Sequence, residues 1–280
     1  TLAANGIKAY IFESLRPTPE LAFAVRELGC IAGINITASH NPPEYNGYKV
    51  YWEDGAQITP PHDTGIMDEV KAVTDYNTVL TMDREKAVAE GNYIVIGQDI
   101  DDKYIAELKK QVKHEDCIKA VGDQIKIVYT PLHGTGNIPA RRILKEIGFK
   151  NVYVVPEQEK PDGEFPTVSY PNPESAEAFV LGLNMAKELD ADLVLATDPD
   201  ADRLGVYVKD QAGDYHCLTG NMSGCLLGEY TISQIKARDG KLPEDGALIK
   251  TIVTTNMADA IAKYYGIELI ECLTGFKYIG

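Results

Sequence analysis

Two polar segments of this chain carry the residue types that chemistry needs. In the first, residues 37–42, Ser39 follows an apolar run; in the second, residues 198–203, three aspartates stand at alternate positions. Carboxylates at that spacing offer enough oxygen ligands for one hard divalent cation. A serine together with a carboxylate-bound metal indicates phosphoryl transfer through a phosphoserine, because the cation neutralises the charge of the moving group. We call these segments the serine loop and the acidic loop.

The acidic loop has two other interpretations. Its aspartates, the acidic triad, are Asp198, Asp200 and Asp202. A calcium EF-hand also begins Asp-x-Asp-x-Asp, but it requires glycine at position six and glutamate at position twelve, where this chain has Arg203 and Lys209. A plain surface loop is disfavoured because three close carboxylates repel one another without a cation. Arg203 suits a phosphate oxygen or a carboxylate through bidentate hydrogen bonds.

The serine loop needs partners, because a serine hydroxyl alone is a weak nucleophile. A hydrolase would need Gly-x-Ser-x-Gly at a strand-to-helix turn, and Asn41 does not fit that motif. A phosphoserine needs hydrogen-bond donors for its oxygens, and His40, Asn41 and Lys49 lie in the same part of the chain. The alternatives are a turn or helix-capping serine and, for Lys49, a lysine on a strand face.

Composition and charge exclude several kinds of partner. The 280 residues are 44% hydrophobic and carry a formal net charge of −15. This acidic excess argues against binding to nucleic acid or anionic lipid, so an anionic substrate needs a local cluster of positive charge. No apolar run approaches the length of about 18 residues that spans a membrane. Five scattered cysteines without a Cys-x-x-Cys pair indicate a reduced, cytoplasmic compartment. Nothing in the sequence indicates an oligomeric state.

A helix end, a glycine and a strand recur three times along the chain. The glycines are Gly6, Gly148 and Gly266, which end a helix by adopting the left-handed conformation. After the first two, we expect a further helix and a second strand, at 30–36 and 191–196, and each second strand runs into one of the two polar loops. This order predicts successive similar mixed α/β domains, with mostly parallel sheets flanked by helices.

The repeat also sets the expected domain bounds. We expect a first domain over 1–98, a second over 99–212 and the start of a third over 213–280. Within them, residues 59–93 have a polar, irregular pattern. A helix is expected at 102–112 and a strand at 125–129. The chain opens like the tail of a helix and closes without a terminal helix, which is the pattern of an internal piece of a longer protein.

The two polar loops together closely resemble the active-site serine loop and the metal loop of the α-D-phosphohexomutases. The matching runs are Thr-Ala-Ser-His-Asn-Pro at 37–42 and Asp-Pro-Asp-Ala-Asp-Arg at 198–203. Within that family, the runs at 46–52 and 273–280 look most like those of phosphoglucomutases. The resemblance covers the whole chain and implies a phosphoglucomutase-like fold.

The resemblance implies an intramolecular phosphotransferase that interconverts α-D-glucose 1-phosphate and glucose 6-phosphate through glucose 1,6-bisphosphate. By resemblance Ser39 carries the phosphoryl group, and Ser39 with the acidic triad holds Mg²⁺. Lys49 falls where the family places a candidate general base, and Arg203 assists at the phosphoryl group. His40 is expected to be catalytic as well. The residues expected to bind the sugar phosphate are Asn41, Thr274, Gly275 and Lys277. In the family, a sugar-recognition loop and a fourth domain follow the position of residue 280, so we expect poor turnover from this chain.

Other functions stay open at this point. A phosphopentomutase or a phosphomannomutase of the same superfamily shares these motifs, and a non-catalytic remnant that binds metal or phosphate is a third possibility. His133 on a predicted strand-to-helix loop could face the cleft or be a hydrogen-bonded structural histidine. The pair Gly134 and Gly136 beside it is a weak phosphate-loop signal, because Gly-x-Gly alone is common.

Overall fold

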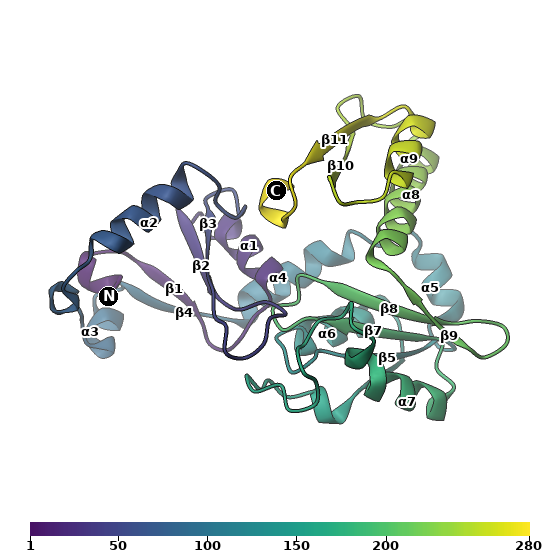
Figure 1. Ribbon diagram of the computed structural model, residues 1–280, viewed down its shortest axis with the longest axis horizontal. Coiled ribbons are helices and arrows are strands. Elements are labelled where there is room, and N and C mark those ends of the chain that lie inside the picture. The colour runs from purple at the N-terminus through teal and green to yellow at the C-terminus, as the bar shows by residue number, and fades with distance from the viewer.

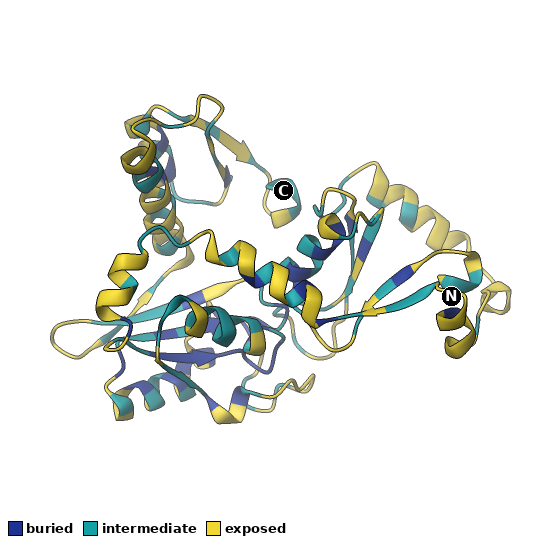
Figure 2. Ribbon diagram, turned by 180° about the vertical axis from the view of Figure 1, so that it is seen from behind, coloured by how far each residue is buried: buried dark blue, intermediate teal, exposed yellow.

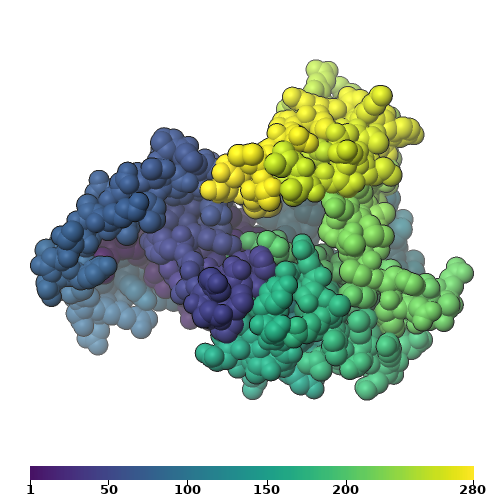
Figure 3. All heavy atoms as spheres, in the orientation of Figure 1, coloured from purple at the N-terminus to yellow at the C-terminus, as the bar shows by residue number.

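The computed structural model describes all 280 residues and has three α/β parts in chain order (Figure 1). Each part contains its own sheet or sheets, with helices packed alongside. Figure 3 shows the face on which the parts meet, hollowed between the C-terminal part and the other two. This architecture confirms the predicted mixed α/β class, in which sheets with parallel strands are flanked by helices.

The first part holds the serine loop. Its elements are β1 (Ala9–Phe12), α1 (Thr18–Glu27), β2 (Ala32–Ile36), β3 (Tyr48–Trp52), α2 (His62–Ala72), α3 (Arg84–Ala89) and β4 (Tyr93–Ile96). Strand β1 pairs with β4 in parallel, and β2 pairs with β3 antiparallel, as two separate two-stranded sheets. Helix α1 begins at Thr18, and Pro19 favours this start because its φ is fixed in the helical range and its missing N–H needs no acceptor in the first turn.

The segment predicted as irregular, 59–93, differs from the expectation, because it contains α2, α3 and the start of β4. Helix α2 has no buried residue. It therefore lacks the strong apolar periodicity from which an amphipathic helix is recognised in a sequence.

The second part holds the acidic loop. Its elements are α4 (Gln98–Lys109), α5 (Glu115–Val121), β5 (Lys126–Thr130), α6 (Asn137–Ile147), β6 (Asn151–Val154), α7 (Val180–Leu189), β7 (Leu193–Thr197), β8 (Leu204–Lys209) and β9 (Tyr215–Leu218). They form one five-stranded sheet in the order β6-β5-β7-β8-β9, in which β8 and β9 are antiparallel. The domain bound expected after residue 212 falls inside the β8–β9 hairpin. The sheet of the second part continues past that bound to the end of β9 at Leu218. Helix α4 begins four residues before the helix expected at 102–112.

The main hydrophobic core lies in this second part. Val128, Val155, Phe179 and Val194 are at most 1% exposed and pack together between the sheet and α7, and the strands of this sheet carry much of the buried colour in Figure 2. Burial on both faces explains why β5 and β7 read as apolar runs. The rigid sheet fixes the direction in which the chain leaves β7, which is where the acidic loop starts.

The third part consists of α8 (Gly220–Asp239), β10 (Ala247–Thr251), α9 (Met257–Tyr265) and β11 (Glu268–Cys272), with β10 and β11 paired in parallel. Gly266 ends α9 at a φ of 68°, as the repeat predicts. Helix α8 and strand β10 were not expected. No helix of the structure is long and apolar enough to cross a membrane. Short 3-10 turns lie at Ala3–Asn5, Tyr76–Thr78, Pro156–Gln158, Ala176–Phe179 and Phe276–Tyr278.

Candidate active site

The serine loop leaves β2 in a tight turn that holds Ser39 half-buried. Ser39 has a φ of 53°, and its backbone N–H donates to Thr37 Oγ1 at 2.9 Å. Asn41 closes the turn by donating from Nδ2 to the carbonyl of Ala38 at 2.9 Å. A left-handed backbone costs a non-glycine residue about 1–3 kcal/mol and persists where the surroundings hold it, often at functional sites. The strained backbone therefore marks Ser39 as a functional position.

The Ser39 hydroxyl reaches the acidic loop. It donates to Asp198 Oδ2 at 3.0 Å, and its Oγ also lies 3.2 Å from His40 Nδ1. The pKa of His40 is lowered by its burial and by the charge of Arg203. A neutral imidazole follows, with a ring nitrogen within hydrogen-bond distance of the serine oxygen.

The acidic triad gathers its oxygens at the end of β7. One carboxylate oxygen from each aspartate lies within 4.8 Å of the others, and Asp198 is fully buried. Asp198 Oδ1 accepts the backbone N–H of Arg203 at 3.0 Å. Burial and the charges of Asp200 and Asp202 nevertheless raise the pKa of Asp198 to about 8. Three oxygen donors that repel one another form the arrangement that a hard divalent cation relieves.

Lys49, from β3, lies against this triad. Its Nζ is 2.8 Å from Asp200 Oδ2 and 3.3 Å from Asp202 Oδ2. Burial alone would lower the pKa of Lys49, but the hydrogen bond and charge of Asp200 outweigh it and the net shift is upward. Burial alone would raise the pKa of Asp200, but the hydrogen bond and charge of Lys49 outweigh burial, so the net shift is downward. The pair is therefore an ion pair, with Lys49 held protonated.

One oxygen of Asp200 remains without a protein partner. Its Oδ2 accepts hydrogen bonds from Lys49 at 2.8 Å and from Thr18 at 3.0 Å, whereas its Oδ1 is buried and accepts none. A buried carboxylate oxygen without a donor is costly unless a cation meets it. The oxygen-only donor set and this unpaired atom fit Mg²⁺.

The glycine segment after β5 supports the acidic loop instead of binding phosphate itself. The Thr135 N–H donates to the carbonyl of Pro199 at 2.8 Å, and a Cβ at Gly134 would meet Pro199 Cα at 2.3 Å. Glycine is required there because the two backbones touch. His133 is buried, with Nε2 2.9 Å from Thr167 Oγ1 and Nδ1 3.2 Å from the carbonyl of Lys160. Those bonds are structural.

The side chains of other predicted residues make no hydrogen bond or ion pair with this cluster. The Arg203 guanidinium is half-exposed and lies 3.8 Å from Glu174. On the C-terminal turn, Lys277 Nζ lies 3.8 Å from Asp63 of α2, and Figure 1 shows this end of the chain beside the first part. No hydrogen bond or ion pair joins Thr274, Gly275 or Lys277 to Ser39 or to the acidic triad.

Two polar residues that the sequence analysis missed belong to the cluster. Thr18, at the start of α1, is buried and donates to Asp200, and Asn35 of β2 donates to Thr18 Oγ1 at 2.5 Å. The only sequence signal was the run Arg-Pro-Thr-Pro at 16–19, which marks a helix start.

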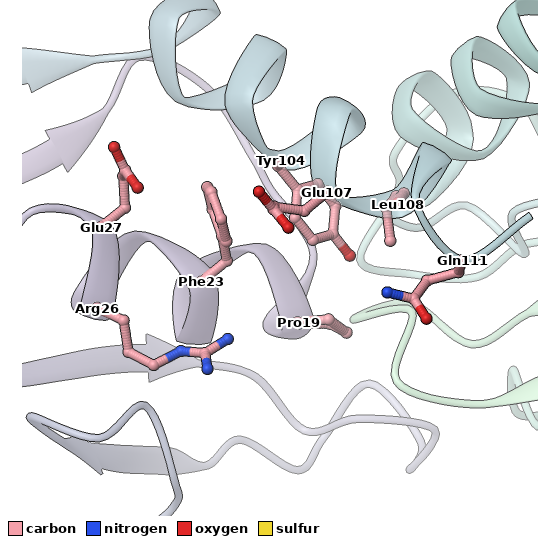
Figure 4. Close-up of a pocket in the computed structure, with 8 residues that line it drawn as sticks. All are labelled: Pro19, Phe23, Arg26, Glu27, Tyr104, Glu107, Leu108 and Gln111. Atoms are coloured by element: carbon pink, nitrogen blue, oxygen red, sulfur yellow. The ribbon is translucent and has the colours of Figure 1, made fainter. Parts of the chain in front are cut away.

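A separate groove of about 510 Å³ runs between α1 and α4 (Figure 4). Phe23 and Tyr104 line it, with ring centroids 5.5 Å apart, together with Glu107 and Gln111. None of its lining residues is a predicted site residue, so the groove is not the chemical centre.

Each of the three parts of the chain matches the model of a known domain family. Family models of the phosphoglucomutase/phosphomannomutase alpha/beta/alpha domains I, II and III match residues 1–77, 102–213 and 219–280. These domains define a class of sugar-phosphate mutases. The chain belongs to the α-D-phosphohexomutase superfamily.

Individual relatives carry different names. The chain is 39% identical over 282 residues to a protein called a probable phosphomannomutase in Haemophilus influenzae, covering all of this chain and 54% of that one. It is 38% identical to a phosphoglucomutase of Staphylococcus saprophyticus, covering 99% and 49%, and 36% identical to a human phosphopentomutase, covering 100% and 46%. The chain thus spans about half the length of these relatives.

A solved structure agrees with the fold. The structure of a phosphoglucomutase/phosphomannomutase family protein from Burkholderia thailandensis superposes with a TM-score of 0.69 at 23% identity, covering 99% of this chain and 54% of that one.

Proposed function

We propose that this chain carries the phosphoserine and the metal site of a mutase that interconverts sugar 1-phosphates and sugar 6-phosphates, with glucose as the sugar. The observation that carries this proposal is the hydrogen bond of 3.0 Å from the Ser39 hydroxyl to Asp198. It joins the predicted phosphoryl carrier to the predicted metal ligands, which come from separate parts of the chain. Phosphoryl transfer depends on this kind of positioning and charge neutralisation.

The acidic triad, with the phosphate of Ser39, would hold the cation. The donor set is oxygen only, and the unpaired Asp200 Oδ1 supports a position for the ion inside the triad. When bound, Mg²⁺ supplies neutralisation of the charge on the phosphoryl oxygens. In the proposed cycle, the free sugar hydroxyl takes the phosphoryl group of phosphorylated Ser39: the bond from Ser39 Oγ to phosphorus breaks, a base takes the proton of the sugar hydroxyl, and Ser39 Oγ is protonated in return. In the second half, the Ser39 hydroxyl loses its proton to the base and takes the other phosphoryl group of glucose 1,6-bisphosphate, and the sugar oxygen released is protonated.

Proton transfer in this cycle needs a base near the serine. His40 is the candidate, because burial and Arg203 lower its pKa and its Nδ1 lies 3.2 Å from Ser39 Oγ. To accept the serine proton, His40 needs that proton to turn from Asp198 Oδ2, where it points in this structure, to Nδ1. Lys49 is held protonated by Asp200 and Asp202. This geometry favours positive charge from Lys49 beside the phosphate over the base role that the resemblance implies.

Residues of both polar loops and of the C-terminal turn are proposed to contact the substrate. Arg203 and Asn41 lie at the exposed rim of the two loops and are proposed to meet the sugar phosphate, together with the C-terminal turn that holds Thr274, Gly275 and Lys277. We propose a first domain bound near residue 98, where α4 begins. We propose the second bound after residue 218, because β9 pairs with β8. The five cysteines are all free, which supports a cytoplasmic location.

The identity of the sugar has competing candidates. Relatives of similar identity are named as acting on mannose, glucose or pentose phosphates, so a phosphomannomutase or a phosphopentomutase is the second candidate. The test is to incubate the protein with Mg²⁺, glucose 1,6-bisphosphate and, in turn, glucose, mannose and ribose 1-phosphates, and to follow the products by phosphorus NMR. Glucose 6-phosphate formed by wild type and not by Ser39→Ala supports the proposal. Conversion of mannose or ribose 1-phosphate alone would replace glucose as the substrate.

A further inference from the structure

We propose that Thr18 is a positioning residue that decides which oxygen of Asp200 faces the metal, and that Asn35 fixes the direction of the Thr18 hydroxyl. This inference rests on the metal site of the proposed function and adds to it a relay from the serine-bearing strand to one metal ligand. None of the relay residues lies in the serine loop or in the acidic loop, apart from Asp200 itself.

The first contact is made by the backbone of Thr18. As the first residue of α1, Thr18 has an N–H that no carbonyl inside the helix accepts. That N–H donates to the backbone carbonyl of Asp200 at 2.9 Å. The start of α1 in the first part of the chain is therefore attached to the acidic loop of the second part.

The second contact is made by the Thr18 side chain, which is 6% exposed. Its hydroxyl donates to Asp200 Oδ2 at 3.0 Å, where Lys49 Nζ also donates at 2.8 Å. Two donors on Oδ2 fix the rotation of the carboxylate. The other oxygen, Oδ1, is left buried and unpaired for a cation.

Asn35 makes the arrangement directional. A threonine hydroxyl has one hydrogen to donate, and its oxygen can accept from a neighbour at the same time. Asn35 Nδ2 donates to Thr18 Oγ1 at 2.5 Å, so the threonine hydrogen is directed at Asp200. Because Asn35 lies on β2, four residues before Ser39, the relay links the strand that carries the phosphoryl carrier to the metal ligand.

The start of α1 is itself held in place. Arg16, two residues before Thr18, donates to both carboxylate oxygens of Asp101 on α4, at 2.7 and 2.8 Å. A bidentate arginine–carboxylate pair is geometrically specific. This ion pair holds the start of α1 against α4, so the position from which Thr18 contacts Asp200 is fixed. A residue that orients a metal ligand needs such a fixed position.

The test is a titration of Mn²⁺, an oxygen-seeking stand-in for Mg²⁺, followed by electron paramagnetic resonance without any sugar phosphate. Loss of a group that orients a metal ligand typically weakens binding about 10–100-fold, and we expect that loss for Thr18→Val. Thr18→Ser keeps the hydroxyl and is expected to stay within about threefold of wild type, as a conservative rescue of that interaction. Thr64→Val is the matched control, because Thr64 is exposed on α2 and its side chain bonds only to Asp63.

A second variant keeps the inference testable if Thr18→Val fails to fold. Asn35→Ala leaves α1 untouched and should also weaken Mn²⁺ binding, by less than Thr18→Val. Folding of each variant is checked by circular dichroism. Unchanged Mn²⁺ affinity in folded Thr18→Val or in Asn35→Ala overturns the relay and leaves the proposed function standing. Absence of Mn²⁺ binding by wild type overturns the metal site itself, and the relay with it.

Discussion

Ser39 and Asp198 are separated by 159 positions in the chain, yet the Ser39 hydroxyl donates to Asp198 Oδ2 at 3.0 Å. Each residue follows a strand that comes second in its repeat, β2 for Ser39 and β7 for Asp198. Ligands gather at the carboxyl ends of parallel strands in open α/β sheets, as at β7, which pairs in parallel with β5, whereas β2 pairs antiparallel with β3. The contact therefore brings equivalent positions of two successive repeats together at one centre.

Asp200→Asn is expected to weaken divalent metal binding by at least about tenfold. The change removes one of the three negative charges of the triad and part of the attraction for the cation. Isothermal titration with Mg²⁺ measures it, with Asp68→Asn as a control, because Asp68 is exposed on α2 and has no polar partner. Equal Mg²⁺ affinity in wild type and Asp200→Asn would remove Asp200 from the metal site.

Gly134→Ala is expected to destabilise the protein by about 1–3 kcal/mol, because the new Cβ would overlap Pro199. The acidic loop would have to move, so Mn²⁺ affinity should fall as well. Gly163→Ala is the matched control, since a Cβ at Gly163 meets nothing within 4 Å. Urea unfolding measures the free energy difference. A Gly134→Ala protein as stable as Gly163→Ala would mean that the close approach to Pro199 is not needed.

A buried carboxyl away from the triad predicts a pH dependence of stability. Glu20 of α1 is 1% exposed and faces Asp101 and Arg16, with Arg142 of α6 nearby. The burial of Glu20 is the largest cause that raises its pKa, to about 8 from an ordinary value of 4.5, and its contact with Asp101 raises it further. The charges of Arg16 and Arg142 lower the pKa but do not outweigh these two effects. Between these two pH values the folded protein keeps a proton that the unfolded chain releases. The free energy of unfolding therefore falls as pH rises through this window, by up to about 1.4 kcal/mol per pH unit.

Glu20→Gln replaces the titrating carboxyl with a neutral amide. The free energy of unfolding should therefore depend less on pH over this window. Urea unfolding at about pH 5.5 and about pH 8.5 is expected to show wild type losing more stability than Glu20→Gln over that interval. Comparing the change in each protein cancels the contributions of the other titrating groups. A parallel loss of stability in both proteins would show that Glu20 ionises normally in the folded state.

The two loops and the strands before them could be predicted because their signals are local. Apolar runs at 30–36 and 191–196 become β2 and β7, and each run leads directly into one of the two polar loops. The spacing of Asp198, Asp200 and Asp202 was itself enough to indicate a cation site, and the structure gathers their oxygens within 4.8 Å.

Contacts between parts of the chain could not be predicted in the same way. The bond from Thr18 to Asp200 joins residues 182 positions apart and depends on how α1 packs against the second part. Helix α2 was missed because it buries no side chain. The weak phosphate signal at Gly134 had a different cause, since a glycine required by a close backbone approach looks the same in a sequence as one that binds phosphate.

The most direct test of the account is the intact mass of the protein before and after incubation with glucose 1,6-bisphosphate and Mg²⁺. A gain of about 80 Da, the mass of one phosphoryl group, is expected, and peptide mapping should place it on Ser39. Ser39→Ala should gain nothing while keeping the circular dichroism of wild type, and Ser169→Ala, at an exposed serine that bonds only to Glu177, should gain the same mass as wild type. No mass gain in folded wild type, or a gain that persists in Ser39→Ala, would contradict the phosphoserine at the centre of this account.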